Sequence, residues 1–392
     1  MATAPAPTSD IDLWSVEILL DPAEAFTELR EQAAAVYLEK NDVWVITRYQ
    51  EIRDTLSDWE GFSSHRVPFN PMAVQALQGT SLTADPPAHT ALRAALTENL
   101  SPRAMRKMKV EIDQKADAIV ERLVEQGSFE GIDDLAAELP IQVVLDLIGV
   151  QGSKRDRILP WGFAAFNTLG PENARTFESF PVAGELHEWS HNIDPEELAE
   201  GSIGRALFAA AARGEIAYES CGKILHQYLA AGMDTTIAAI SYALKAFGEN
   251  PEQWELLRSD PSLVPAAFNE SLRYEALMHT QGRNTTVETV VDGVVIPADA
   301  QVGVLFWAGN RDPRHYESPD EFRIERNPVD HLSFGYGVHS CAGQGLAKLE
   351  VHAVLTSLVN RVESFKTGEA KRKINNSSRP LESVPVYDIV AA

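Results

Sequence analysis

The chain has 392 residues, 44% of them hydrophobic and 23% charged, a composition that allows a large buried core and a cofactor within it. The formal net charge of -23 argues against nucleic acid or an anionic membrane as the main partner, because both are polyanions. The two cysteines are too few for a disulfide framework and no CxxC motif occurs, which indicates a reducing compartment.

The N-terminal segment is rich in small residues and proline, so we expect residues 1–12 to be flexible. It lacks the basic stretch and apolar core of a signal peptide, and no apolar run in the chain reaches transmembrane length. We therefore expect a cytoplasmic protein without a membrane partner. Because neither a repeat nor a long linker interrupts the sequence, residues 1–392 are predicted to form one domain.

Helical patterns dominate the first two thirds of the chain, after one candidate strand at 43–49 ("VWVITRY"). Residues 92–127 carry apolar side chains at three- and four-residue spacing up to Gly127, which predicts amphipathic helices. Residues 214–250 are mostly apolar and contain no proline, which predicts a long, buried central helix.

The last third combines a small β portion with irregular chain. Residues 285–307 predict a hairpin that turns at Asp292-Gly293, followed by another strand. Residues 310–328 are polar and irregular. The fold class predicted from these patterns is mainly α with a small β portion.

Cys341 lies just before a helix-like run and is framed by Gly335, Gly337 and Gly343. Unpaired amides at a helix start, here those of Gly343 and Gln344, favour a thiolate over a thiol. The glycines allow tight turns and a close approach to a flat object.

Four roles are open for such a cysteine: nucleophile, zinc ligand, axial ligand to iron, or buried structural residue. Zinc needs about four ligands, and only His339 lies nearby in the sequence. His339 could instead serve as the base for a nucleophile. A lone cysteine is most often structural, but the complete Phe-x-x-Gly-x-His-x-Cys-x-Gly spacing from Phe334 to Gly343 removes that preference.

The segment "FGYGVHSCAG" (334–343) resembles the haem-ligand loop of cytochrome P-450 enzymes. This resemblance implies haem b as the cofactor, Cys341 as its thiolate ligand, and Phe334 and Gly343 beside it. It also implies the fold of that family, a triangular prism with haem between the central long helix and the helix that follows the cysteine.

Further segments carry the same resemblance along most of the chain. In "NESLRYE", Glu270 and Arg273 share a helix face and match the family's Glu-x-x-Arg pair, with Arg326 as the third, structural member. The segment "ADPPAHTALR" (84–93) resembles the family's haem-propionate segment. The residues expected to hold the two propionates are His89, Arg93, Arg283 and His339.

The segment "LAAGMDTT" (229–236) resembles the family's oxygen-activation segment. Gly232 would let the helix approach haem and leave room for O₂, and Thr235 can bond back to the carbonyl of Ala231. Asp234 and Thr235 would deliver protons, which favours a monooxygenase driven by electrons over a peroxide-driven peroxygenase or a non-catalytic haem-binding protein. Cys221, upstream in the same helix, is interpreted as an ordinary buried cysteine.

Alternatives outside haem chemistry are weaker, since no Gly-x-Ser-x-Gly elbow of a hydrolase occurs. The electron donor implied by the resemblance is an iron-sulfur ferredoxin with its NAD(P)H reductase. Basic residues in two regions are expected to attract it: Arg103, Arg106, Lys107, Lys109 and Lys348.

The segments 165–173, 310–314 and 375–386 resemble the bacterial P-450 group that oxidises para-substituted benzoic acids. This resemblance implies a small aromatic substrate that is hydroxylated or O-demethylated, either a methoxybenzoate or a methoxyphenol such as guaiacol or syringol. The residues expected at the substrate are Arg66 on a carboxylate, Phe166 and Leu169 on the ring, and Gln227 and Ala231 on the central helix.

The chain departs from that group at two places. His226 and Gln227 replace an Arg-Ser pair of the group, and loop 67–82 is shorter. Both changes weaken the expectation of a carboxylate and leave open a neutral phenol, whose hydroxyl Gln227 could bond.

Overall fold

The computed structural model describes residues 6–150 and 155–392. The α-helices are α1 Val16–Leu20, α2 Ala23–Gln32, α3 Tyr49–Ser57, α4 Pro71–Ala76, α5 Ala88–Thr97, α6 Pro102–Gln126, α7 Glu138–Ile148, α8 Arg155–Asn167, α9 Ala174–Asn192, α10 Ile203–Ala212, α11 Tyr218–Gly232, α12 Asp234–Glu249, α13 Pro251–Ser259, α14 Val264–Glu275, α15 Phe306–Asn310 and α16 Gln344–Arg361. The shorter helical turns are η1 Glu98–Leu100, η2 Gly131–Ala136, η3 Pro195–Glu197, η4 Pro261–Leu263, η5 Ile324–Arg326, η6 Leu332–Phe334 and η7 Gly337–His339.

The strands form four small sheets. They are β1 Thr8–Ser9, β2 Ala35–Leu38, β3 Val43–Ile46, β4 Phe62–Ser63, β5 Phe129–Glu130, β6 Gln281–Thr285, β7 Thr289–Val291, β8 Val294–Ile296, β9 Gln301–Val304, β10 Val362–Thr367, β11 Lys371–Arg372, β12 Leu381–Ser383 and β13 Pro385–Ala391. The largest sheet has the order β1-β2-β3-β9-β6-β4, and the others are β10-β13-β5, β11-β12 and β7-β8.

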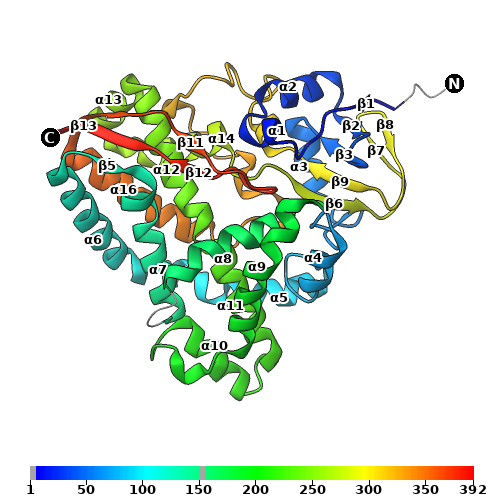
Figure 1. Ribbon diagram of the computed structural model, residues 1–392, viewed down its shortest axis with the longest axis horizontal. Helices are drawn as coiled ribbons and strands as arrows, with labels where there is room; N and C mark the ends of the chain where they lie inside the picture. The colour runs from blue at the N-terminus through cyan, green and yellow to red at the C-terminus, as the bar shows by residue number, and fades with distance from the viewer. Residues whose placement is uncertain (1–5, 151–154) are drawn as a thin grey trace.

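Figure 1 shows a roughly triangular outline, with the largest sheet at the upper right, strands β5 and β13 at the upper left, and helices over most of the remainder. The main apolar core lies among α6, α7, α11, α12, α14 and α16. Helix α16, which follows Cys341, packs against α6, α12 and α14. The expected mainly α fold with a small β portion is therefore confirmed.

The helix that ends at Gly127 illustrates how the sequence sets these bounds. Helix α6 begins after Ser101, whose side chain accepts a hydrogen bond from the amide of Ala104, and Pro102 occupies the first turn, where no amide donor is needed. It ends at Gly127, which adopts a left-handed φ of 75° that glycine tolerates best. The expected hairpin is also present, since β7 and β8 pair around Asp292-Gly293 and β9 follows.

The expectation of a flexible segment over residues 1–12 is wrong for part of that range. Thr8 and Ser9 form β1, which pairs in parallel with Tyr37 and Leu38 of β2. Residues 1–5 lie outside the described residues. Backbone pairing with a sheet edge, which composition does not reveal, orders this short polar strand.

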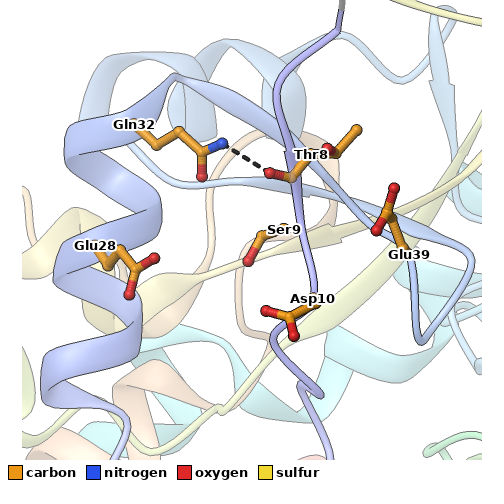
Figure 2. A pocket seen from close by; sticks show the side chains of 6 residues that line it. All are labelled: Thr8, Ser9, Asp10, Glu28, Gln32 and Glu39. Atoms are coloured by element: carbon orange, nitrogen blue, oxygen red, sulfur yellow. Dashed lines mark hydrogen bonds between the residues drawn. The ribbon is translucent and has the colours of Figure 1, made fainter.

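Figure 2 shows the hollow of about 570 Å³ that β1 helps to form at the surface, beside α2. Its lining is polar and acidic, and Gln32 donates a 2.8 Å hydrogen bond to the carbonyl of Thr8 across it. The hollow lies where β1 packs beside α2, and none of the expected site residues lines it.

The long central helix expected over 214–250 is interrupted. It forms as two helices, α11 and α12, with Met233 between them at φ -108° and ψ -63°. The expected back-bond is present, since the Thr235 hydroxyl donates to the carbonyl of Ala231 over 2.8 Å. That bond takes the acceptor that the Thr235 amide would use in an uninterrupted helix, which explains the break. In the described part of the chain, no helix is long and apolar enough to span a membrane.

Candidate functional site

The segment before α16 holds Cys341 through short turns rather than regular structure. The chain passes through η6 and η7, and the amide of Cys341 donates to the carbonyl of Phe334 over 2.7 Å. Gly337 has a left-handed φ of 69°, and a Cβ there would lie 2.4 Å from the carbonyl oxygen of Leu56 in α3. Any other residue at 337 would therefore displace the cysteine segment from α3.

The electrostatics at Cys341 differ in part from expectation. Burial raises the pKa of the Cys341 thiol, although the amides of Gly343 and Gln344 bond to the sulfur and, with the Arg93 charge, act to lower it. The expected amide donors are thus present, but burial outweighs them. The sulfur is arranged to bind a positively charged partner, whose charge would compensate for the desolvation of a thiolate.

The four residues expected to hold carboxylates converge beside the cysteine segment. His89, on α5, has its ring centre 4.2 Å from that of His339 in η7. Arg93, one turn after His89, donates to the carbonyl of Ser340. Arg283, on β6, is buried, and its charge lowers the pKa of His339.

The charge of Asp85 acts on three members of this cluster, since it raises the pKa values of His89, Arg283 and His339, but other effects outweigh it. The Nε2 atoms of His89 and His339 are buried without a hydrogen-bond partner among the described residues. Burial, together with the neighbouring cations, lowers the pKa of His339 to about 3, and burial lowers that of Arg283 to about 10. Unpartnered donors and crowded cations are the environment that two buried carboxylates would satisfy, so the cluster fits the propionates of haem b.

The expected structural triad forms behind the cysteine segment. Glu270 and Arg273 on α14 are fully buried and form two hydrogen bonds of 2.7 and 2.8 Å. Arg326 bonds to Glu270 over 3.2 Å and reaches the carbonyls of Glu317 and Ser318. The triad therefore ties the irregular segment 310–328 to α14.

Ala231 and Gly232 are the last two residues of α11 before the break, and they face different surroundings. Ala231 is exposed although both helices around it are largely buried, so open space lies beside it. Gly232 does not face that space: a Cβ there would meet Val144 of α7 at 3.4 Å. The expectation that Gly232 lets the helix approach haem stays a prediction, and its packing against α7 is a second reason for a small residue there.

Asp234 is half-buried, and this burial raises its pKa to about 7. A Cβ on Gly162 of α8 would lie 3.1 Å from the Asp234 carboxylate, so the two helices meet closely there. The charge of Lys373 acts to lower the pKa of Asp234. Lys373 is exposed and its Nζ lies 4.2 Å from the centre of the Phe163 ring.

The residues expected at the substrate lie in different surroundings. Arg66 pairs with Asp299 at the surface, and its contact with a substrate carboxylate stays a prediction. Phe166 and Leu169 lie at and just after the end of α8, both half-buried. Gln227 accepts a 2.6 Å hydrogen bond from Ser81 and donates one of 3.1 Å to the carbonyl of Lys223.

Two sets of residues escaped sequence reasoning. Ser81 and Lys223 fasten loop 77–83 to α11, and Lys373 lies near Asp234 from a distant part of the chain. Nothing in the spacing of Ser81 or Lys373 marks them, because their partners are distant in the sequence. The expectation of a buried Cys221 is confirmed, with its sulfur 3.6 Å from the carbonyl of Leu207. Phe334 packs 6.1 Å from Phe268 between ring centres, and its place beside the cofactor stays a prediction.

Comparisons with known proteins agree on one family. A family model described as "Cytochrome P450" matches residues 210–384. The chain is 33% identical over 98% of its length to "Cytochrome p450 CYP199A2" of Rhodopseudomonas palustris, covering 95% of that protein. It is 30% identical over 94% of its length to the "Beta-dihydromenaquinone-9 omega-hydroxylase" of Mycobacterium tuberculosis, covering 76% of that protein.

Among solved structures, the chain resembles "cytochrome P450 CREJ in complex with (4-ethylphenyl) dihydrogen phosphate" at 28% identity and a TM-score of 0.84. That similarity covers 97% of this chain and 98% of the other.

Proposed function

Because the chain belongs to the cytochrome P450 family, we propose that this monooxygenase transfers one oxygen atom from O₂ to a small aromatic substrate and removes a methyl group from a methoxybenzoate or a methoxyphenol. The observation that carries the proposal is the convergence of Cys341 with the donor cluster of His89, Arg93, Arg283 and His339.

The cofactor of the family is haem b bound through a cysteine thiolate, and it supplies the activation of O₂ by two electrons. Cys341 is the proposed ligand, with the amides of Gly343 and Gln344 donating to its sulfur. Those donors limit the basicity of the thiolate and protect it from oxidation. The donor cluster would hold the two propionates.

Proton delivery is assigned to Asp234 and Thr235. With a pKa near 7, Asp234 is partly protonated at neutral pH, so it can release and regain a proton. The charge of the exposed Lys373 acts to lower the pKa of this carboxyl and so favours release of its proton. The Thr235 hydroxyl, beside the exposed Ala231, would pass the proton to the open side of the helix.

An aromatic substrate is supported by the residues around that open side. Phe166 and Leu169 offer apolar surface at the end of α8, and the Ser81–Gln227 pair offers polar groups on α11. The similar structure of CREJ holds a para-substituted phenyl compound, which supports a ring of this size. Hydroxylating a methoxy carbon yields an unstable hemiacetal that decays to a phenol and formaldehyde, so formaldehyde reports the reaction.

The proposed electron donor is an acidic ferredoxin with its NAD(P)H reductase. Four exposed cations lie along the start of α6, which packs against α16: Arg103, Arg106, Lys107 and Lys109. A hollow of about 240 Å³ opens beside the cysteine segment and is lined by residues including Phe334, Tyr336 and Lys348. Charges near an entry point for electrons raise the rate of encounter with an acidic partner.

The test is turnover with a ferredoxin, its reductase and NAD(P)H, using 4-methoxybenzoate, guaiacol and syringol in parallel. We expect formaldehyde and the corresponding phenol in amounts that depend on O₂ and on the electron donor. Product formed from hydrogen peroxide alone at an equal rate would instead identify a peroxygenase. Failure of every ring to shift the ferric spin state or to release formaldehyde would refute the aromatic substrate.

A further inference from the structure

Loop 77–83 is a compact turn that closes on itself. The hydroxyls of Thr80 and Thr83 both donate to the carbonyl of Leu77, over 2.8 and 2.7 Å. Gly79 between them has a left-handed φ of 74°. Because the loop satisfies the hydroxyls of Thr80 and Thr83 itself, both are buried without belonging to a helix or strand, and Ser81 between them is buried too.

The loop is fastened to α11 at two points. The Nζ of Lys223 donates to the carbonyl of Gln78 over 3.2 Å, and the Ser81 hydroxyl donates to Oε1 of Gln227 over 2.6 Å. Nε2 of Gln227 donates in turn to the carbonyl of Lys223. Side chains one turn apart on the same helix thus hold the loop in one position.

Gln227 belongs to the stripe of the central helix that borders the open side. Residues four apart share a helix face, so Gln227 is followed on that face by Ala231, which is exposed and whose carbonyl accepts the Thr235 hydroxyl. A substrate presented to Thr235 therefore lies along the same stripe as Gln227. The Ser81–Gln227 pair supplies polar groups on that stripe of the helix.

No free cation faces this pair from the loop or from α11. Lys223 and His226 are the only basic residues in loop 77–83 and α11, both of which the structure describes in full. Lys223 is directed to the Gln78 carbonyl, and burial lowers the pKa of His226 to about 4, which leaves it neutral at pH 7. Arg66, the expected partner of a carboxylate, is bound to Asp299.

We propose that the Ser81–Gln227 pair makes the site select a neutral ring hydroxyl over a ring carboxylate. This inference rests on the proposed aromatic function and narrows its substrate class to phenols. Gln227 keeps one amide hydrogen and Ser81 keeps acceptor lone pairs after their mutual bond. A phenol, which both donates and accepts, satisfies both groups.

A carboxylate at the same place would be disfavoured for two reasons. It has no hydrogen to donate, so it would face the lone pairs of Ser81. It would also be a buried charge for which loop 77–83 and α11 supply no free cation, which is costly. The proposed selectivity for a phenol over a carboxylate therefore comes from the lack of a free cation as well as from the hydrogen-bonding groups of Ser81 and Gln227.

The experiment compares 4-methoxyphenol with 4-methoxybenzoate, which differ in the group opposite the methoxy carbon. Dissociation constants come from the ferric spin-state shift and, independently, from calorimetry on the holoenzyme at pH 7.5. We expect the wild-type protein to bind the phenol at least about tenfold more tightly. Gln227→Ala and Ser81→Ala should each weaken the phenol about three- to tenfold and leave the benzoate unchanged or tighter.

The matched control is Gln75→Ala, which removes an exposed glutamine from the neighbouring helix α4 and should change neither affinity. Hydrogen exchange of residues 77–83 should rise in Gln227→Ala and not in the control. Tighter binding of the benzoate by the wild-type protein, or equal losses for both ligands in the variants, would overturn the inference alone. Absence of binding by both rings would overturn it together with the aromatic function.

Discussion

The cysteine segment and the proposed substrate side of the central helix, the face that carries Gln227 and Ala231, are built in different ways. Around Cys341, several contacts hold the segment together: the amide of Cys341 bonds to Phe334, Arg93 bonds to the carbonyl of Ser340, and the buried Glu270–Arg273 pair lies behind them. Around Gln227, a loop from residues 77–83 meets a helix about 145 residues later through single hydrogen bonds, such as Lys223 to Gln78. We therefore regard the cysteine segment as a rigid support for a cofactor. The contacts between loop 77–83 and α11 are single hydrogen bonds that other side chains could replace.

This difference explains why the two sides carry different information. The cysteine segment must hold one sulfur beside the donor cluster of four side chains, so few other residues fit its positions. Its sequence motif therefore identifies the family. Single hydrogen bonds such as Ser81–Gln227 can be exchanged for others without loss of fold, so they can set the substrate. Variants on the two sides should therefore fail differently, by stability and cofactor binding on one and by selectivity or coupling on the other.

The largest effect is expected from Glu270→Ala on the cysteine side. The variant leaves Arg273 buried without its carboxylate and removes the bond to Arg326, which should cost about 3–5 kcal/mol of unfolding free energy. Urea unfolding followed by circular dichroism measures this. Glu255→Ala, at an exposed position of α13, is the control and should change stability by less than about 0.5 kcal/mol. Equal effects of the two variants would mean that the triad is not a rigid frame.

A smaller effect concerns Asp234 and pH. Because its pKa rises from 3.8 unfolded to about 7 folded, its contribution to stability is fully present below about pH 4 and is lost as pH rises through 7. Between pH 5 and pH 8 this loss should be about 2.6 kcal/mol, and Asp234→Asn should abolish it.

The exposed Asp133→Asn variant is the control for this pH dependence and should keep the wild-type profile. An identical pH profile in Asp234→Asn and in the wild-type protein would contradict the assignment. Lys373→Met should move the loss to higher pH, because the Lys373 charge lowers the pKa of Asp234.

Thr235→Ala should leave haem and substrate binding intact while product per NAD(P)H falls roughly tenfold to a hundredfold and hydrogen peroxide rises. The reason is the loss of the hydroxyl that bonds to Ala231 and would pass protons to the open side. The adjacent Thr236→Ala, on a buried face of α12, provides the comparison and should keep its coupling. Unchanged coupling in Thr235→Ala would assign the alcohol function elsewhere.

The smallest effect is expected at the surface. Reversing the charges of Arg106 and Lys107 to glutamate should slow reduction by a ferredoxin about tenfold at low salt and little at high salt. Lys371→Glu, outside α6 and α16, should leave the rate unchanged. Reduction that ignores both the reversal and the ionic strength would exclude this patch as the docking region.

The sequence predicted much of the cysteine segment and its supporting residues, but less of the contacts around Gln227, for physical reasons. Local patterns placed Gly127 at a helix end and Asp292-Gly293 in a turn, because such positions depend on neighbours in the chain. The motif brought His89 and His339 together correctly. The break at Met233, the pairing of Arg66 with Asp299 and the position of β1 depend on distant partners, which periodicity does not encode.

The central claim is that Cys341 is the thiolate ligand of haem b, and the carbon monoxide spectrum of the reduced protein tests it most directly. The wild-type protein should give the spectrum characteristic of a thiolate ligand, as should Cys221→Ala, because Cys221 is buried against Leu207 away from the donor cluster. Cys341→Ala should lose that spectrum. A thiolate-type spectrum that survives in Cys341→Ala, or disappears in Cys221→Ala, would contradict the account.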